Sequence, residues 1–165
     1  MLALLNTVLL VILTALAPVS EVRGAIPLAY ILAPDDHSKW VMVALAVGCN
    51  ALLPFVLLNL LQFVEDILLK SSDGLLEGLA RVYMRLVSRA RMQGAKYLRR
   101  WGYLGLAVFV AIPLPATGAW TASLVAHVFG LNKLKSSLAI VVGVLVASAI
   151  VILALEGIIT AVNTF

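Results

Sequence analysis

Charge and cysteine are both scarce in this chain of 165 residues. Only 12% of the residues are charged, and Cys49 is the single cysteine. One cysteine excludes a disulfide framework and a cysteine-based metal cluster. No zinc-site, P-loop or nucleophile-elbow pattern occurs. We therefore expect no metal, no cofactor and no enzymatic activity.

Apolar residues dominate instead, at 63% of the chain, which is far more than a soluble domain carries. Acidic and basic residues are absent from 1–20, 40–64, 101–132 and 136–155. Each run is about long enough to cross a membrane, which takes roughly 20 residues of helix. The composition predicts an all-α, polytopic integral membrane protein that forms a single domain over 1–165.

The start of the chain resembles a signal peptide only in part. Residues 1–17 are apolar, but no basic residue precedes them, and Pro18-Val19-Ser20 is a poor cleavage site. We expect a retained helix.

Basic residues are concentrated in the segment 65–101, and this clustering sets the expected orientation. Lys133 and Lys135 form a second basic loop, whereas 35–39 is acidic. Cytoplasmic loops of membrane proteins carry an excess of lysine and arginine. We expect both basic segments in the cytoplasm, the protein in the cell membrane, and no nucleic-acid partner.

This orientation places Trp101 and Asn132 on the same side of the membrane. The residues between them contain turn-forming Pro and Gly, and the flanks 102–111 and 119–131 are each too short to span. A re-entrant hairpin satisfies charges, lengths and prolines together. Two tilted crossings or one kinked helix that violates the charge rule are the alternatives.

The tetrapeptide Ala-Ile-Pro-Leu occurs at Ala25–Leu28 and again at Ala111–Leu114. A proline breaks a helix, and a broken helix in lipid is tolerated only inside protein or beside a cavity. Overlaying the copies predicts a first hairpin at 18–34, broken around 20–27. The result is an inverted repeat of re-entrant hairpin plus transmembrane helix, with repeats at 1–64 and 102–165.

The connector 65–101 joins these repeats. Apolar residues recur at helical spacing over 75–90, with charged residues largely on the other face. The pattern predicts a basic amphipathic helix on the cytoplasmic membrane surface. A solvated connector whose arginines only set the orientation is the alternative.

Two segments carry a resemblance to a known family. Ser20–Leu28 (SEVRGAIPL) and Ala111–Leu124 (AIPLPATGAWTASL) resemble the signature segments of the small multidrug export protein family. That family is similar to the DedA family and to the VTT-domain lipid scramblases. The resemblance implies opposed re-entrant hairpins, an acidic residue in the first hairpin and arginines in the second. Glu21 matches the first feature, but no arginine lies between Trp101 and Asn132.

Glu21 and Arg23 lead the candidate site residues, because an ionisable residue in a membrane segment is costly and indicates function. Glu21 can exchange a coupling proton, and Arg23 can hold an anionic headgroup. As a structural alternative, the two side chains pair with each other or pin the turn of the hairpin.

Further candidates lie at the expected helix breaks or bring polarity into an apolar hairpin. Amide groups freed at such breaks can face an anion. These candidates are Pro27, Pro113, Pro115, Thr117, Gly118, Trp120 and Thr121. Otherwise the prolines only kink packed helices, and the polar side chains satisfy freed carbonyls. Asn50, His127 and Glu156 are secondary candidates.

The resemblance implies transport or flipping of a substrate in a prokaryotic inner (plasma) membrane. Together with Glu21 and Arg23 it favours a transporter or flippase that moves an amphipathic or anionic lipid-like substrate, coupled to protons through Glu21. Small drug-like cations are the alternative substrate, and a non-transporting scaffold or assembly factor is the alternative function. Membrane lipid is the expected partner. The thin bundle also predicts a homodimer, since two-fold dimers are the commonest assembly.

Overall fold

A computed structural model describes residues 2–70, 74–112 and 117–164. Every regular element in these ranges is an α-helix, as the composition predicts. The helices are α1 (Leu2–Leu16), α2 (Glu21–Leu32), α3 (Asp36–Lys70), α4 (Gly74–Ala111), α5 (Ala119–Val128) and α6 (Lys133–Thr164).

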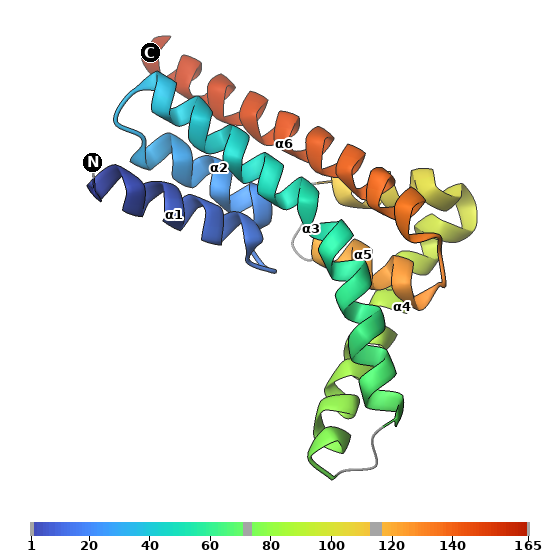
Figure 1. The fold of residues 1–165 in the computed structure, drawn as a ribbon. Helices are drawn as coiled ribbons and strands as arrows, with labels where there is room; N and C mark the ends of the chain where they lie inside the picture. Colours follow the sequence, from blue (N-terminus) through green and yellow to red (C-terminus); the bar gives the residue numbers. More distant parts are fainter. Residues whose placement is uncertain (1, 71–73, 113–116, 165) are drawn as a thin grey trace.

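Two of these helices, α3 and α6, are long and apolar enough to cross a membrane. They pack against each other and run in opposite directions (Figure 1). Each helix contains one of the uncharged runs, 40–64 or 136–155, and extends beyond it at both ends; polar residues cap their N-termini. Asp35 accepts the Ser38 N–H at 2.9 Å and Asn132 accepts the Lys135 N–H at 3.1 Å. The Ser38 amide, followed by its hydroxyl, also holds the pKa of Asp35 below its usual value.

The remaining helices of the bundle form two hairpins. In the first, α1 packs against α2 across a short turn at residues 17–20. In the second, the part of α4 after Gly102 packs against α5. Gly102 has φ +55° and ψ −129°, so the helix is interrupted at the start of the predicted flank 102–111. The start of α2, in the first hairpin, meets the start of α5, in the second, in the middle of the molecule (Figure 1).

The first hairpin differs from its prediction. Helix α1, within the expected N-terminal helix at 1–17, supplies its first arm, and the turn precedes Glu21 rather than lying around 20–27. Pro27 lies inside α2, which continues to Leu32. A proline removes one backbone hydrogen bond but need not end a helix whose faces are packed. The prediction that Pro27 breaks the helix is wrong.

The two copies of Ala-Ile-Pro-Leu therefore occupy different places in their hairpins. Ala25–Leu28 follows its turn, within α2, whereas Ala111 ends α4 and precedes the second turn. The overlay of the two copies does not hold in the structure. Pro113 and Pro115 lie outside the described residues.

The second hairpin returns to the end of the molecule where it began. The Asn132 N–H donates to the Tyr103 hydroxyl at 3.2 Å, which joins the start of the hairpin to the residues that follow it. Helix α6 packs closely on this hairpin at Gly143. A Cβ there would lie 2.6 Å from the Ala107 carbonyl oxygen, so only glycine allows the approach.

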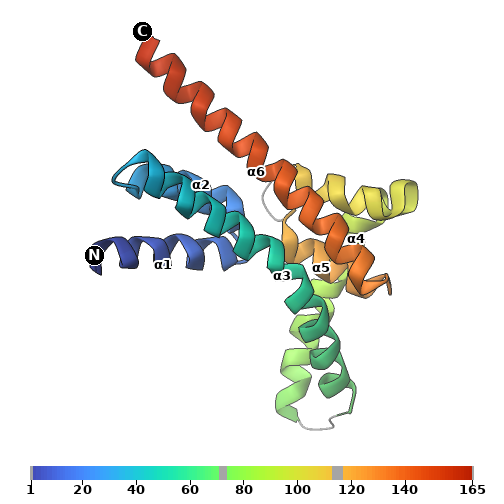
Figure 2. The ribbon, with the colours of Figure 1, turned by 45° about the horizontal axis from the view of Figure 1, so that its top comes forward.

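The end of α3 and the first part of α4 run side by side away from the bundle in both views (Figures 1 and 2). Residues 65–70 continue α3 rather than starting the connector, and α4 covers the helix predicted at 75–90 and extends it to both sides. Most side chains of the predicted amphipathic face at 75–90 lie outside the described residues.

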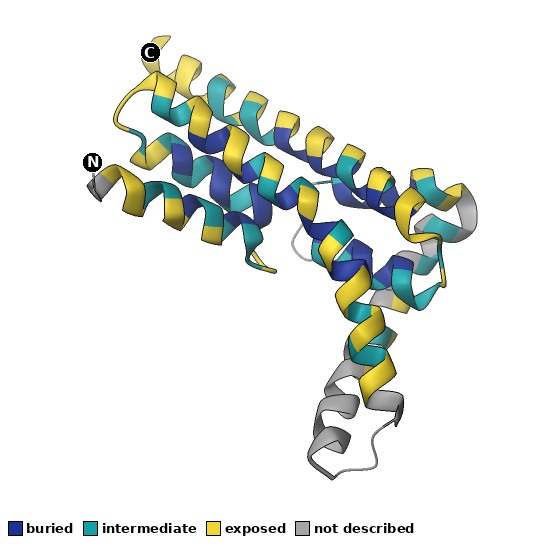
Figure 3. Ribbon diagram, viewed as in Figure 1, coloured by how far each residue is buried: buried dark blue, intermediate teal, exposed yellow. Residues whose placement is uncertain are grey.

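Buried and exposed residues alternate around the bundle helices (Figure 3). The core includes Ile26, Met42, Leu58 and Leu106, each at most 1% exposed. The outer faces carry many large apolar side chains, including Leu153, which is 73% exposed. Apolar surface on this scale marks contact with lipid or with other protein.

Candidate functional site at the meeting of the two hairpins

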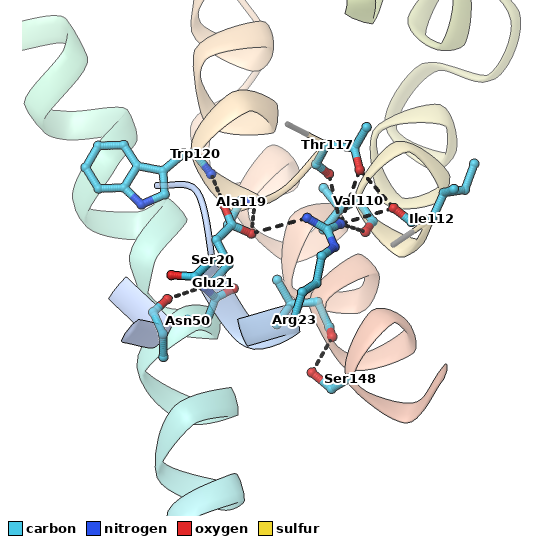
Figure 4. Close-up of polar contacts among 12 residues, drawn as sticks. Ser20, Glu21, Arg23, Asn50, Val110, Ile112, Thr117, Ala119, Trp120 and Ser148 are labelled. Atoms are coloured by element: carbon cyan, nitrogen blue, oxygen red, sulfur yellow. Dashed lines mark hydrogen bonds and ion pairs between the residues drawn. The ribbon is translucent and has the colours of Figure 1, made fainter. Parts of the chain in front are cut away.

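Glu21 joins the two hairpins. It opens α2, is 3% exposed, and has a left-handed φ of +48°, which is unusual for a residue other than glycine. Its Oε2 accepts the Ala119 N–H at 3.0 Å and its Oε1 accepts the Trp120 N–H at 3.2 Å (Figure 4). These amides begin α5, where the helix dipole favours a negative charge. The carboxylate of one hairpin thus caps the helix of the other.

Gly118 makes room for this contact. A Cβ added at Gly118 would overlap the Glu21 carboxylate group. The backbone of the second hairpin therefore approaches the carboxylate more closely than any other residue type allows. This requirement, rather than helix breaking alone, explains a glycine at position 118.

Arg23 makes the complementary contact. Its Nη2 lies within hydrogen-bonding distance of the carbonyl oxygens of Val110 (2.9 Å), Ile112 (3.1 Å) and Thr117 (3.4 Å), and of the Thr117 Oγ1 (3.2 Å). An Nη2 group has two hydrogens, so these acceptors share them. The Val110 and Ile112 carbonyls lie where α4 ends and its backbone lacks helical partners, whereas Thr117 lies just before α5.

Glu21 and Arg23 also face each other, with 3.9 Å between Oε2 and Nη1. The Arg23 side chain is only 16% exposed, and its Nε is buried without a hydrogen-bond partner. This geometry agrees with the structural alternative stated above, in which Glu21 and Arg23 pair with each other and pin the turn. It also places an acid and a base together in the centre of an apolar bundle.

Two further side chains hold the turn of the first hairpin. Trp120 donates its Nε1–H to the Leu16 carbonyl at 3.0 Å, and Asn50 donates its Nδ2 to the Ala15 carbonyl at 2.7 Å. Both carbonyls lie at the end of α1, where intrahelical donors run out. We call the contacts that Glu21, Arg23, Asn50 and Trp120 make around the two turns the joint. Trp120 contributes to it twice, through its backbone N–H and its indole.

Other predicted residues occupy different places. Thr121 lies partly buried next to Trp120 on α5, and Pro27 lies beyond Arg23 on α2. His127, near the other end of α5, has its Nε2 2.8 Å from the Glu65 Oε2. Glu156 accepts the Tyr30 hydroxyl at 2.7 Å, at the opposite end of α2 from Glu21. The structure does not bring His127 or Glu156 to the meeting of the hairpins.

Sequence reasoning missed the main-chain partners in this joint. They are the amides of Ala119 and Trp120 and the carbonyls of Leu16, Val110 and Ile112. Every residue carries these groups, so side-chain identity gave no signal of their role. The glycine at 118 was the single residue that could have indicated a close approach.

Two long apolar helices with exposed leucines and valines indicate a membrane protein. The family model described as "Putative small multi-drug export protein" matches residues 21–150, and the chain belongs to this family. The resemblance predicted from the two segments is confirmed. No curated protein and no solved structure matches the chain. Membership indicates a transporter rather than an enzyme.

Proposed function

We propose that the protein exports its substrate across the cell membrane by proton-coupled parting of the two hairpins. In this proposal α3 and α6 cross the membrane, and the hairpins enter it from opposite sides as an inverted repeat. The lengths of α3 and α6, their exposed apolar side chains and the concentration of basic residues in the segment 65–101 support this arrangement.

One observation carries the proposal, namely that the Glu21 carboxylate accepts both the Ala119 and the Trp120 N–H groups. A hydrogen bond to an ionised acceptor is roughly twice as strong as one to a neutral acceptor. Protonation of Glu21 therefore weakens both bonds and its attraction to Arg23. Proton binding loosens the joint, and proton release restores it.

Arg23 positions the joint and also bears on the substrate. Three carbonyls compete for its Nη2, while its buried Nε has no hydrogen-bond partner. When the hairpins part, the guanidinium loses its carbonyl partners and can meet an anionic headgroup. An amphipathic, anionic lipid-like molecule is therefore the proposed substrate, and a drug-like cation is the alternative.

A non-transporting scaffold is the second candidate function, because every contact described here also stabilises a static joint. Flux measurements in proteoliposomes that contain a pH indicator distinguish the transporter from the scaffold. Labelled polyprenyl phosphate and ethidium serve as probes. We expect proton movement coupled to one probe, and loss of that coupling in Glu21→Gln.

Asp66→Asn is the matched control, since Asp66 is an exposed acid on α3. It should keep the flux of the unmodified chain. Glutamine mimics a protonated Glu21, so Glu21→Gln should still insert and bind the probe. Coupling that survives in Glu21→Gln would rule out Glu21 as the coupling residue, and no flux of either probe would favour the scaffold.

The orientation has its own test in a Cys49→Ser background. Cysteines introduced at the exposed positions Ser88 and Lys135 should react with an impermeant maleimide from the same side of the membrane. A cysteine at exposed His37 should react from the other side. Labelling of positions 88 and 135 from opposite sides would contradict the re-entrant second hairpin.

A further inference from the structure

A second cluster lies at the other end of α2, about 13 Å from Glu21 by the rise of nine helical residues. The Lys39 Nζ lies 4.8 Å from the centre of the Tyr30 ring and 5.3 Å from the centre of the Trp40 ring. The same ammonium lies 2.9 Å from Asp36 Oδ1 and 3.8 Å from Glu156 Oε1. Two aromatic rings and two carboxylates thus surround one cation.

The walls of this cluster are held independently of Lys39. The Tyr30 hydroxyl donates to Glu156 Oε1 at 2.7 Å, which ties α2 to α6. The Tyr30 and Trp40 rings lie edge to face, 6.2 Å apart between centres at an interplanar angle of 75°. Tyr30, Trp40 and Glu156 come from three helices, so the bundle itself sets their spacing.

The cluster has more negative than positive charge and is open to the surface. Two carboxylates, of Asp36 and Glu156, face the single ammonium of Lys39. Trp40 is 46% exposed. Lys39 reaches the cluster on a flexible four-carbon stem that can also extend to water. A second cation can therefore replace the ammonium without moving the backbone.

We propose that Tyr30, Trp40, Asp36 and Glu156 form a binding site for a small organic cation of the quaternary ammonium class, and that Lys39 is its internal occupant. Aromatic faces attract such cations, and aromatic cages are the established means of recognising them. A metal ion fits poorly, because ring faces supply no oxygen, nitrogen or sulfur ligand. Within the described residues, no group of three or more His, Cys, Asp or Glu side chains is placed to hold a metal.

This site is separate from the joint at Glu21 and does not depend on the proposed proton coupling. The two places are nevertheless linked mechanically, because Glu21 opens α2 and Tyr30 lies near its end. A cation bound here would be held at the end of the first hairpin, beside the loop to α3.

Calorimetric titration of the purified full chain in detergent with tetramethylammonium tests the site. This cation is hydrophilic, so it does not partition into micelles. Lys39→Ala removes the internal occupant, and we expect it to bind at least about tenfold more tightly than the unmodified chain. Lys39→Arg keeps a cation in place and should show no gain. Adding Trp40→Leu to Lys39→Ala should reduce the affinity by roughly tenfold, which lies between the values for exposed and desolvated cation–π contacts, since Trp40 is half-exposed.

The neutral isostere 3,3-dimethylbutan-1-ol is the matched control ligand, since it has the same shape without the charge. Equal affinities of Lys39→Ala and the unmodified chain, or equal binding of the alcohol and the cation, would overturn the proposal. If Lys39→Ala fails to fold, acetylation of the unmodified chain decides. Saturating tetramethylammonium should raise the acetylation rate of Lys39 relative to exposed Lys135, and an unchanged rate would overturn the site.

Discussion

The two hairpins contribute opposite kinds of groups to the joint between them. The first supplies charged side chains, Glu21 and Arg23, whereas the second supplies mainly backbone amides and carbonyls. A helix start attracts an anion and a helix end attracts a cation, so the interrupted second hairpin needs no charge of its own. The absence of an arginine between Trp101 and Asn132 follows from this division, because Arg23 of the first hairpin already contacts the carbonyls there.

The same division distinguishes the joint from the cluster at Lys39. At the joint, backbone amides and carbonyls at helix ends stabilise the buried charges of Glu21 and Arg23 by hydrogen bonds. At Lys39, side chains from three helices surround a partly exposed cation. A helix end has a fixed geometry, whereas a lysine side chain can leave its partners. The joint therefore fits a closure that is opened by a change of charge, and the cluster fits exchange of one cation for another.

The largest effect is expected at Gly118, where the two hairpins come closest. Gly118→Ala places a methyl group on the Glu21 carboxylate, so the turns must separate. Overpacking of this kind costs about 1–3 kcal/mol, and breaking both amide bonds to a buried carboxylate adds to it. Thermal unfolding in detergent should show a drop of at least about 3 kcal/mol.

Gly157→Ala is the matched control for this substitution. A Cβ at Gly157 meets no atom within 4 Å, so the change should be neutral or slightly stabilising in helix α6. The double variant Glu21→Ala, Gly118→Ala should recover part of the loss, because it removes the overlap. Equal stabilities of Gly118→Ala and Gly157→Ala would contradict the contact.

A smaller effect is expected when Arg23 becomes methionine, which keeps much of the stem but removes the guanidinium. The Val110 carbonyl loses its Arg23 donor, the Ile112 carbonyl keeps only the Thr117 hydroxyl as a donor, and Glu21 loses its cation. Leaving buried acceptors unsatisfied costs about 1–3 kcal/mol. Arg89→Met, at an exposed position of α4, should change the unfolding free energy by less than about 0.5 kcal/mol. Equal small changes in both variants would show that Arg23 is not essential to the joint.

The smallest effect tests a side chain of the second hairpin, Trp120, that donates to the first. Trp120→Phe keeps an aromatic ring but removes the Nε1–H bond to the Leu16 carbonyl. A loss of about 1 kcal/mol is expected, which is the usual net value of such a bond plus some lost packing. Trp101→Phe, in a half-exposed tryptophan, is the control. If Trp120→Phe lowers the unfolding free energy much more than Arg23→Met does, the first hairpin's charged side chains are not the main contribution to the joint.

Much of the fold could be predicted from local sequence. Apolar runs predicted the two long helices, and the Pro/Gly segment predicted that α4 ends at Ala111 and α5 begins at Ala119. The first turn was placed wrongly, because Pro27 was treated as a break. The hairpins' re-entry into the membrane, the homodimer and the relation to DedA proteins stay predictions.

The sequence predicted the charged side chains of the candidate site but not the groups that they contact. Glu21 and Arg23 stand out as charges in an apolar segment, but their partners are backbone groups that any residue carries. The cluster at Lys39 joins residues 30, 39, 40 and 156, which are distant in sequence and individually ordinary for the end of a membrane helix.

The sequence by itself determined the class of protein, the number of long apolar helices, the interruption before α5 and the family. These follow from composition and from short-range backbone preferences, which act within a few residues. Only the tertiary structure decided that α1 is an arm of the first hairpin, that Glu21 caps α5, and that a lysine fills an aromatic cluster. Such contacts depend on how helices far apart in the chain pack, because hydrogen bonds and cation–π contacts act over only a few ångströms.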